Sequence, residues 1–156
     1  MVKKEKAIFA AGCFWGVQEQ FDSLKGVLST KVGYTGGHTE KPSYKQVCSG
    51  ETGHAEAVEV IFDSEKIDYS KLLDKFWEIH DPTQLNQQGP DFGSQYRSAI
   101  FYTSEKQKKE AQSSLKKEQK KIKGKIVTEI TKSSNFYDAE EYHQNYNKKN
   151  GRSCFI

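Results

Sequence analysis

The sequence has no hydrophobic run long enough to cross a membrane. A transmembrane helix needs about 18 or more consecutive apolar residues, and the longest candidate, residues 7–17, is interrupted by Gly12 and Gly16. Lysines before this stretch and the small residues at 10–13 resemble an export signal. However, the apolar part before that point is shorter than the roughly 7–15 residues of a working signal. We therefore expect a soluble, cytoplasmic protein that does not bind membranes.

Cysteine is scarce, and its spacing argues against two structural roles. The three cysteines, Cys13, Cys48 and Cys154, are odd in number and far apart. This pattern disfavours a disulfide framework and a zinc site, which needs closely paired cysteines. A reducing compartment and one or two reactive thiols fit the pattern better.

The chain also lacks a strong charge imbalance, internal repeats and linker-like stretches. A net charge of +3 is too small to indicate a nucleic-acid partner. The lysine-rich residues 106–125 contain interspersed glutamates and no aromatic side chain for base stacking, so we interpret them as a solvated helix face. The 156 residues predict one domain, 1–156, and a monomer. Residues 148–156 are expected to form a mobile tail.

Hydrophobic periodicity predicts alternating strands and helices. Strands are expected at residues 6–11, 27–34, 54–62, 96–103 and 126–131. Helices are expected at 14–24, 68–80, 105–121 and 138–146, with one turn or a loop at 44–49. Strand 54–62 is apolar on both faces, which is typical of a central strand covered on both sides. The fold class is therefore α+β, a mixed β-sheet with helices packed on it.

Cys13 is the first candidate for chemistry. It lies where a strand ends and a helix begins, and the N-terminus of a helix favours a thiolate. Phe14 and Trp15 point in different directions on a helix, so at least one should border the pocket of the thiol. Aromatic walls suit a ligand with a sulfur or a methyl group. By position alone, Cys13 is equally consistent with a small buried hydrophobe.

Glu56 is the second candidate, because it lies in the strand that is apolar on both faces. Burial there raises the pKa of a carboxyl, which can then donate a proton near neutral pH. A glutamate at the strand edge, reaching water, is the open alternative. Asp91 and Tyr96 flank the long polar loop 83–95, a type of loop that is usually functional, and Tyr44 lies in another loop. Taken singly, each is interpreted as a surface polar group.

The other two cysteines have weaker signals. Cys154 lies near the C-terminus beside Gly151, where a mobile tail can bring it to a distant nucleophile. The alternative is an idle exposed thiol, which is uncommon in a soluble protein. Cys48 has no obvious partner, and we favour a buried structural role for it.

Together these motifs are similar to one known family. Gly12-Cys13-Phe14-Trp15-Gly16 resembles the catalytic signature of the A-type peptide methionine sulfoxide reductases. The resemblance covers most of the chain, through residues 33–37, 44–50, 52–58, 76–86, 89–98 and 139–144. It implies a two-layer α/β sandwich with a ferredoxin-like core, and it implies no metal and no organic cofactor.

The resemblance also implies roles for individual residues. Cys13 attacks the sulfoxide sulfur, and Glu56 protonates the sulfoxide oxygen. The methyl group is held by Phe14, Trp15 and Tyr96, and the oxygen or a nearby water is held by Tyr44 and Asp91. Cys154 then forms a disulfide with the sulfenic acid left on Cys13.

The implied reaction is the reduction of methionine sulfoxide, free or in proteins. Repair of this lesion uses one enzyme class for each sulfoxide epimer, and the resemblance implies the S epimer, with thioredoxin as the reductant. Two rival functions remain open at this point. A thiol peroxidase would also use a reactive cysteine and a resolving cysteine. A non-catalytic peptide-binding module is disfavoured because Cys13, Glu56 and Cys154 are all present.

Overall fold

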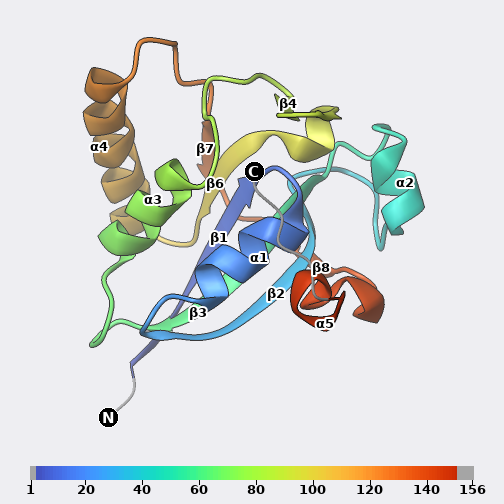
Figure 1. Ribbon diagram of the computed structural model, residues 1–156, viewed down its shortest axis with the longest axis horizontal. Coiled ribbons are helices and arrows are strands. Elements are labelled where there is room, and N and C mark those ends of the chain that lie inside the picture. Colours follow the sequence, from blue (N-terminus) through green and yellow to red (C-terminus); the bar gives the residue numbers. More distant parts are fainter. Residues whose placement is uncertain (1–2, 151–156) are drawn as a thin grey trace.

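Six strands form the central sheet of the computed structural model, which describes residues 3–150 (Figure 1). Their spatial order is β7-β6-β1-β3-β2-β8. The strands are β1 (Lys4–Ala11), β2 (Val27–Thr35), β3 (Ala55–Asp63), β6 (Ser98–Tyr102), β7 (Glu129–Lys132) and β8 (Tyr137–Asp138). Only β6 and β7 pair in parallel, and the other neighbours are antiparallel. The predicted mixed sheet is confirmed.

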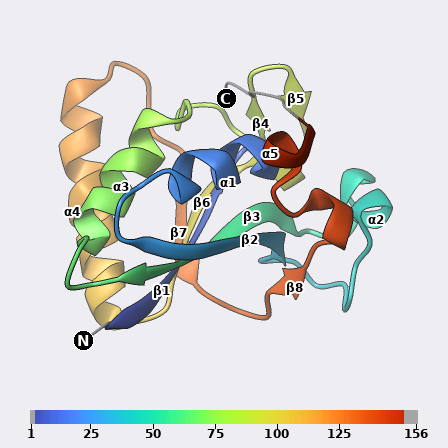
Figure 2. The ribbon, with the colours of Figure 1, turned by 60° about the horizontal axis from the view of Figure 1, so that its bottom comes forward.

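The helices connect these strands in a ferredoxin-like pattern. They are α1 (Phe14–Asp22), α2 (Tyr44–Cys48), α3 (Tyr69–Glu78), α4 (Glu105–Lys121) and α5 (Tyr146–Asn150). The chain order β1-α1-β2-β3-α3-β6, with the spatial order β6-β1-β3-β2, is the βαββαβ arrangement of that fold. In Figure 2, α1, α3 and α4 lie on one face of the sheet, so the predicted α/β sandwich is confirmed.

The two faces of the sheet are packed differently because strand residues alternate between them. On the helix side, large side chains of β1 and β3 meet those of α1 and α3, including Phe9, Phe62, Phe21, Leu72 and Phe76. The other face has a smaller cluster of mostly small side chains, formed by Ile8, Ala10, Ala55, Ala57, Ala99 and Phe101. Strand β3 is therefore buried on both faces, as its composition predicted.

The long polar loop before β6 is ordered rather than featureless. It contains a small hairpin of two strands with two residues each, β4 (Gln87–Gln88) and β5 (Asp91–Phe92). The 3₁₀ turn η1 (Ser94–Tyr96) follows. The Gln88 side chain accepts the N–H of Asp81 and donates to its carbonyl, both at 2.9 Å. Tyr96 was expected in the following strand, but it belongs to this turn. The reason is that Gly93 turns the chain with a φ of 128°, before strand pairing begins.

The C-terminal part differs most from expectation. The helix predicted at 138–146 is wrong, since residues 137–138 pair with β2 as β8 and the 3₁₀ turn η2 (Glu141–His143) follows. The Gln144 side chain exchanges two 2.9 Å hydrogen bonds with the backbone of Val32, which holds the segment extended along the sheet edge. Residues 148–150, expected in a tail, belong to α5. The rest of that tail, with Cys154, lies outside the described residues. The strand predicted at 126–131 is shifted to β7.

Candidate active site

Cys13 occupies the junction between β1 and α1, as the N-cap residue of α1. Gly12 has a φ of 100°, a conformation that glycine adopts without a steric penalty, and it turns the chain sharply into the helix. The side chain of Cys13 is half-buried. The first turn of α1 contains no acidic residue that would offset the positive end of the helix dipole. This position favours the thiolate form of Cys13.

Glu56 lies on β3 and is directed to the helix-covered face, like Val58. Its side chain is buried, and its Oε1 accepts the backbone N–H of Phe14 at 3.2 Å. Its Oε2 is buried and has no hydrogen-bond partner within the described chain. Burial raises the pKa of Glu56 to about 8, although the hydrogen bond from Phe14 acts in the opposite direction. At neutral pH the carboxyl is therefore mostly protonated, next to the residue that follows Cys13.

Two tyrosines and an aspartate share this environment. Tyr44 and Tyr96 are half-buried, and the pKa of each hydroxyl is raised by burial and then by the nearby Glu56 carboxyl. The charge of Cys13 also raises the pKa of Tyr96. Asp91 is half-buried, which raises its pKa, and its charge in turn raises the pKa of Glu56. The structure thus brings Cys13, Glu56, Tyr44, Tyr96 and Asp91 into one region from four separate segments.

The aromatic pair after Cys13 diverges, as its spacing predicted. Phe14 is fully buried, with its ring centroid 5.7 Å from that of Tyr34 and 6.4 Å from that of Tyr44. Trp15 is half-buried and stacks on Tyr146 of α5 at 3.8 Å between ring centroids. Trp15 also lines a cavity of about 330 Å³ between α1 and the segment around α5. Phe14 therefore belongs to the core, and Trp15 forms an accessible wall of this cavity.

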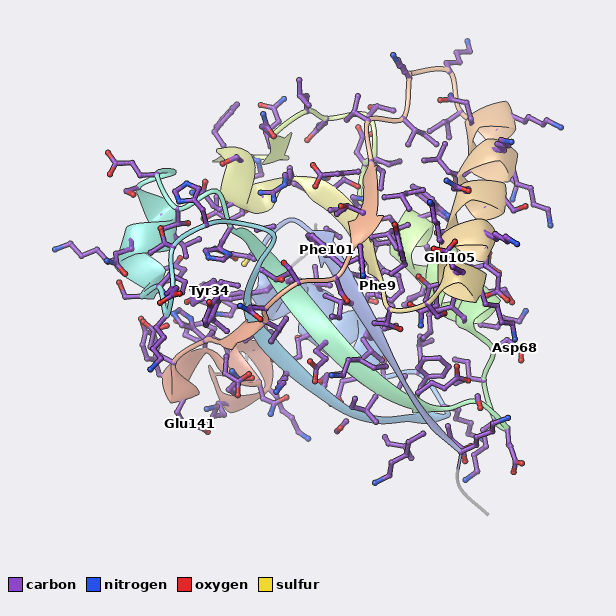
Figure 3. The ribbon with its side chains drawn as sticks, turned by 180° about the vertical axis from the view of Figure 1, so that it is seen from behind. Phe9, Tyr34, Asp68, Phe101, Glu105 and Glu141 are labelled. Carbon is purple, nitrogen blue, oxygen red and sulfur yellow. The ribbon has the colours of Figure 1, made fainter. Side chains whose placement is uncertain are left out.

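Glu140 is a residue of this region that sequence reasoning missed. Its carboxylate accepts the hydroxyl of Tyr34 at 2.9 Å and the backbone N–H of Tyr44 at 3.0 Å. Partial burial opposes the charged form, but these hydrogen bonds lower the pKa of Glu140 below its usual value. Figure 3 shows Tyr34 at the end of the sheet where α2 and the C-terminal segment meet. The only sequence signal for Glu140 was its place in motif 139–144, which suggested no role.

Cys48 is exposed, so the expectation of a buried structural cysteine is wrong. It is the last residue of the short helix α2, in which only Val47 is buried. Its carbonyl accepts a hydrogen bond from Gln95 at 3.4 Å, which ties α2 to the loop that carries Asp91. Neighbouring protein atoms desolvate the thiol in part, which raises the pKa of Cys48, although a hydrogen bond with Tyr44 acts to lower it. Cys48 is therefore a neighbour of the site, and its thiol stays protonated near neutral pH.

Residues 3–150 have neither a cluster of metal ligands nor an apolar helix long enough to span a membrane. No group of three or more His, Cys, Asp or Glu side chains in this range is arranged to hold a metal ion. None of the helices in the same range combines the length and the apolar composition of a membrane span.

Comparison with known proteins places this chain in a family. The family model described as peptide methionine sulfoxide reductase matches residues 5–156. A relative named peptide methionine sulfoxide reductase MsrA, from Methanothermobacter thermautotrophicus, is 56% identical over 155 residues, covering 97% of this chain and 92% of the relative.

Solved structures agree with the sequence comparison. The reduced form of Mxr1 from Saccharomyces cerevisiae matches with a TM-score of 0.93 and 41% identity, covering 97% of this chain and 88% of that chain. Mxr1 in complex with Trx2 matches with a TM-score of 0.68 and 30% identity, covering 92% and 85% respectively. The chain therefore belongs to the A-type peptide methionine sulfoxide reductases, and it is an enzyme that reduces methionine sulfoxide.

Proposed function

We propose that this enzyme reduces the S epimer of methionine sulfoxide, free or in proteins, with Cys13 as nucleophile and Glu56 as acid. The observation that carries this proposal is the environment of Glu56. One carboxyl oxygen is held by the N–H of Phe14, and the other is buried and unpaired. A protonated carboxyl with a spare oxygen next to Cys13 is the group that sulfoxide reduction requires, because a sulfoxide oxygen leaves poorly until it is protonated.

In the first step the Cys13 thiolate attacks the sulfoxide sulfur while Glu56 gives a proton to the oxygen. The protonated oxygen then passes from the substrate sulfur to the sulfur of Cys13 as the bond between the two sulfurs breaks. Methionine leaves reduced by two electrons, and Cys13 is oxidised to a sulfenic acid. The raised pKa values of Tyr44 and Tyr96 keep both hydroxyls protonated, so both can donate to the substrate oxygen. Asp91 acts with them by holding a water near that oxygen.

The methyl group of the substrate is assigned to a pocket formed by Trp15, Tyr96 and Phe14. Trp15 supports this assignment through its half-exposed ring, and Tyr96 through its proximity to Cys13. Phe14 is fully buried, so it contributes the floor rather than the mouth of such a pocket. Contacts between sulfur or methyl groups and aromatic rings are favourable, by roughly 0.3–1.5 kcal/mol each.

In the second step Cys154 condenses with the sulfenic acid, releasing water and forming a disulfide that thioredoxin reduces. The stacking of Tyr146 on Trp15 supports this role, since it anchors α5 beside the helix that Cys13 begins. The four residues that follow Asn150, ending at Cys154, can span at most about 14 Å. The complex of the yeast relative with Trx2 supports thioredoxin as the reductant. Cys48, with its raised pKa, is the less reactive alternative.

The nucleophile is tested with dabsyl-methionine sulfoxide, offered as separate S and R epimers with dithiothreitol and followed by chromatography. Wild type should convert only the S epimer. Cys13→Ser should give no turnover, because a hydroxyl is a far weaker nucleophile than a thiolate. The matched control Cys48→Ser should retain turnover. Appreciable product from Cys13→Ser would place the nucleophile elsewhere, and conversion of the R epimer would contradict the assigned stereochemistry.

The resolving cysteine is tested with Cys154→Ser. This variant should release one methionine per enzyme and then stop with thioredoxin, because no disulfide forms for thioredoxin to attack. Dithiothreitol should partly restore turnover by reaching Cys13 directly. Mass spectrometry of wild type after one turnover should show a Cys13–Cys154 bond with Cys48 still alkylatable. A Cys13–Cys48 bond, or full thioredoxin-supported turnover by Cys154→Ser, would refute the assignment.

A further inference from the structure

His143 lies directly behind the aromatic residues of the site, and none of its surface is exposed. It belongs to the turn η2, which follows Glu140. Its ring centroid lies 4.3 Å from that of Tyr44, 5.3 Å from that of Phe14 and 4.0 Å from that of Tyr142. A histidine buried among aromatic rings needs a reason, because a phenylalanine fills such a space without desolvating a polar ring.

The reason lies in a hydrogen bond to the wall of the site. The indole Nε1–H of Trp15 donates to Nδ1 of His143 at 2.9 Å, across 128 residues of sequence. An Nδ1 that accepts carries no proton, so the neutral ring carries its proton on Nε2. That Nε2 is buried without a partner in the described chain, which is unfavourable for folding. The hydrogen bond that Nδ1 of His143 accepts from Trp15 offsets this cost.

The surroundings keep His143 in the neutral form that this bond needs. Burial lowers its pKa below the usual value, and the nearby Glu140 carboxylate acts in the opposite direction. The other titratable groups whose rings face it are Tyr44 on α2 and Tyr142 beside it. Protonation of Nδ1 would turn it into a donor that faces the N–H of Trp15. The hydrogen bond that fixes the indole would then be lost.

Trp15 is held at a second point by Tyr146, whose ring is stacked on it with an interplanar angle of 11°. The indole thus has one face covered and its polar edge fixed, while the side chain as a whole is only half-buried. A half-buried tryptophan without these two contacts would sample other rotamers. The contact to His143 is the directional one, because a hydrogen bond specifies the angle of the ring as well as its position.

We propose that His143 is a positioning residue for sulfoxide reduction, which fixes the indole of Trp15 as one wall of the substrate pocket by accepting its N–H. This inference rests on the proposed function, which assigns Trp15 to the pocket for the methyl group. A wall held in one orientation orders the substrate sulfur relative to Cys13, and small misplacements at such a position are costly for rate.

Two variants separate the effect of the hydrogen-bond acceptor on His143 from the effect of the size of its ring. His143→Phe keeps an aromatic ring and removes the acceptor, whereas the side-chain oxygen of His143→Asn can take the place of Nδ1. For the S epimer of N-acetylmethionine sulfoxide with dithiothreitol, His143→Phe should lower kcat/KM about tenfold, the usual scale for one lost hydrogen bond. His143→Asn should stay within about threefold of wild type, since it restores the bond.

A spectroscopic readout follows Trp15 itself. The chain has two tryptophans, so Trp77→Phe leaves Trp15 as the only one. In this background His143→Phe should shift the emission of Trp15 and increase its quenching by acrylamide, while His143→Asn should leave both near the parent values. The parent should also show an emission change on acidification, below the ordinary pKa of histidine, and His143→Asn should lack it because asparagine does not titrate.

The outcomes separate this inference from the proposed function. Unchanged emission and unchanged kcat/KM in His143→Phe would overturn the inference, as would equal losses in His143→Phe and His143→Asn with Trp15 emission unaltered. Trp15→Phe provides the separate check. If Trp15→Phe retains full kcat/KM while Cys13→Ser is inactive, the assignment of Trp15 to the pocket fails, and the role of His143 in the reaction fails with it.

Discussion

Two glutamates on strand β3, three positions apart, lie on opposite faces of the same sheet. Glu56 faces the helices, where burial raises its pKa to about 8 and its partner is the N–H of Phe14. Glu59 faces the other side, where Lys6 lies 3.7 Å and Lys31 3.6 Å from its carboxylate oxygens. Lys31 is directly opposite Glu59 in the pairing of β2 with β3.

This pair shows that two carboxyls with similar burial on one strand can have very different neighbours. Glu56 is 1% exposed and Glu59 7% exposed, so the two differ little in access to water. They differ in the groups around them, because Glu59 has two lysines beside its carboxylate and Glu56 has the backbone N–H of Phe14. On the helix-covered face, burial raises the pKa of Glu56 enough for it to hold a proton at neutral pH.

The largest expected difference between the two faces is in the rate of sulfoxide reduction. Glu56→Gln should slow methionine release in a single turnover by roughly 10²–10⁴-fold, as is typical when a general acid is lost. Glu59→Gln, on the same strand, should stay within about threefold of wild type. Quenched-flow measurement of methionine release tests both. If Glu56→Gln were as fast as Glu59→Gln, another group would have to supply the proton.

A smaller difference is expected in the pH dependence of that rate. Because the proposed reaction needs protonated Glu56, whose pKa is about 8, the single-turnover rate should fall about tenfold for each pH unit well above that value. Glu59→Gln should show the same decline, whereas Glu56→Gln should not, because its amide does not titrate in this range. A decline that persists unchanged in Glu56→Gln would assign it to a different group.

The smallest effect is on stability, where the two substitutions should act with opposite signs. Between pH 4.5 and about 8 the folded protein keeps on Glu56 a proton that the unfolded chain has released, so stability falls as pH rises through this window. Glu56→Gln removes this loss and should be more stable than wild type at pH 9, by on the order of 1–4 kcal/mol. Glu59→Gln removes the ion pairs with Lys6 and Lys31, although Lys31 keeps its pair with Asp138, and should be less stable by about 1 kcal/mol or less.

Urea unfolding of both variants and wild type at pH 5 and pH 9 measures these effects. The gain of Glu56→Gln should nearly vanish at pH 5, where wild-type Glu56 is already neutral in the folded state. The loss in Glu59→Gln should shrink at high salt, since half-exposed lysines are screened. Destabilisation by Glu56→Gln at pH 9 would mean that the ionised carboxylate has a favourable partner after all.

Much of the fold was predictable because its signals are local. Apolar residues on both faces of segment 54–62 predicted a covered central strand, and β3 is that strand. A helix was expected from residue 105, and the hydroxyl of Ser104 accepts the N–H of Gln107 at the start of α4. The position of Cys13 between a strand and a helix followed in the same way from the break at Gly12. Periodicity and capping act within a few residues, so the sequence expresses them directly.

The motifs also indicated the chemistry before the structure did. The resemblance around Cys13 and Glu56 implied a methionine sulfoxide reductase, and family membership decides against the thiol peroxidase and the peptide-binding module that composition left open. That Phe14 and Trp15 point in different directions also followed from helical spacing. The sequence alone did not determine which of the two would be buried.

The sequence by itself determined five of the six strands of the central sheet, most of the helices and the residue types of the site, whereas the tertiary structure decided which groups meet. The bond from Phe14 to Glu56 spans 42 residues, and that from Trp15 to His143 spans 128. The C-terminal segment became an edge strand and a turn, rather than the predicted helix, because the backbone of β2 offered it partners. Cys48 proved exposed because α2 is too short to bury it. Such contacts depend on how distant segments pack, and hydrophobic periodicity carries no record of that packing.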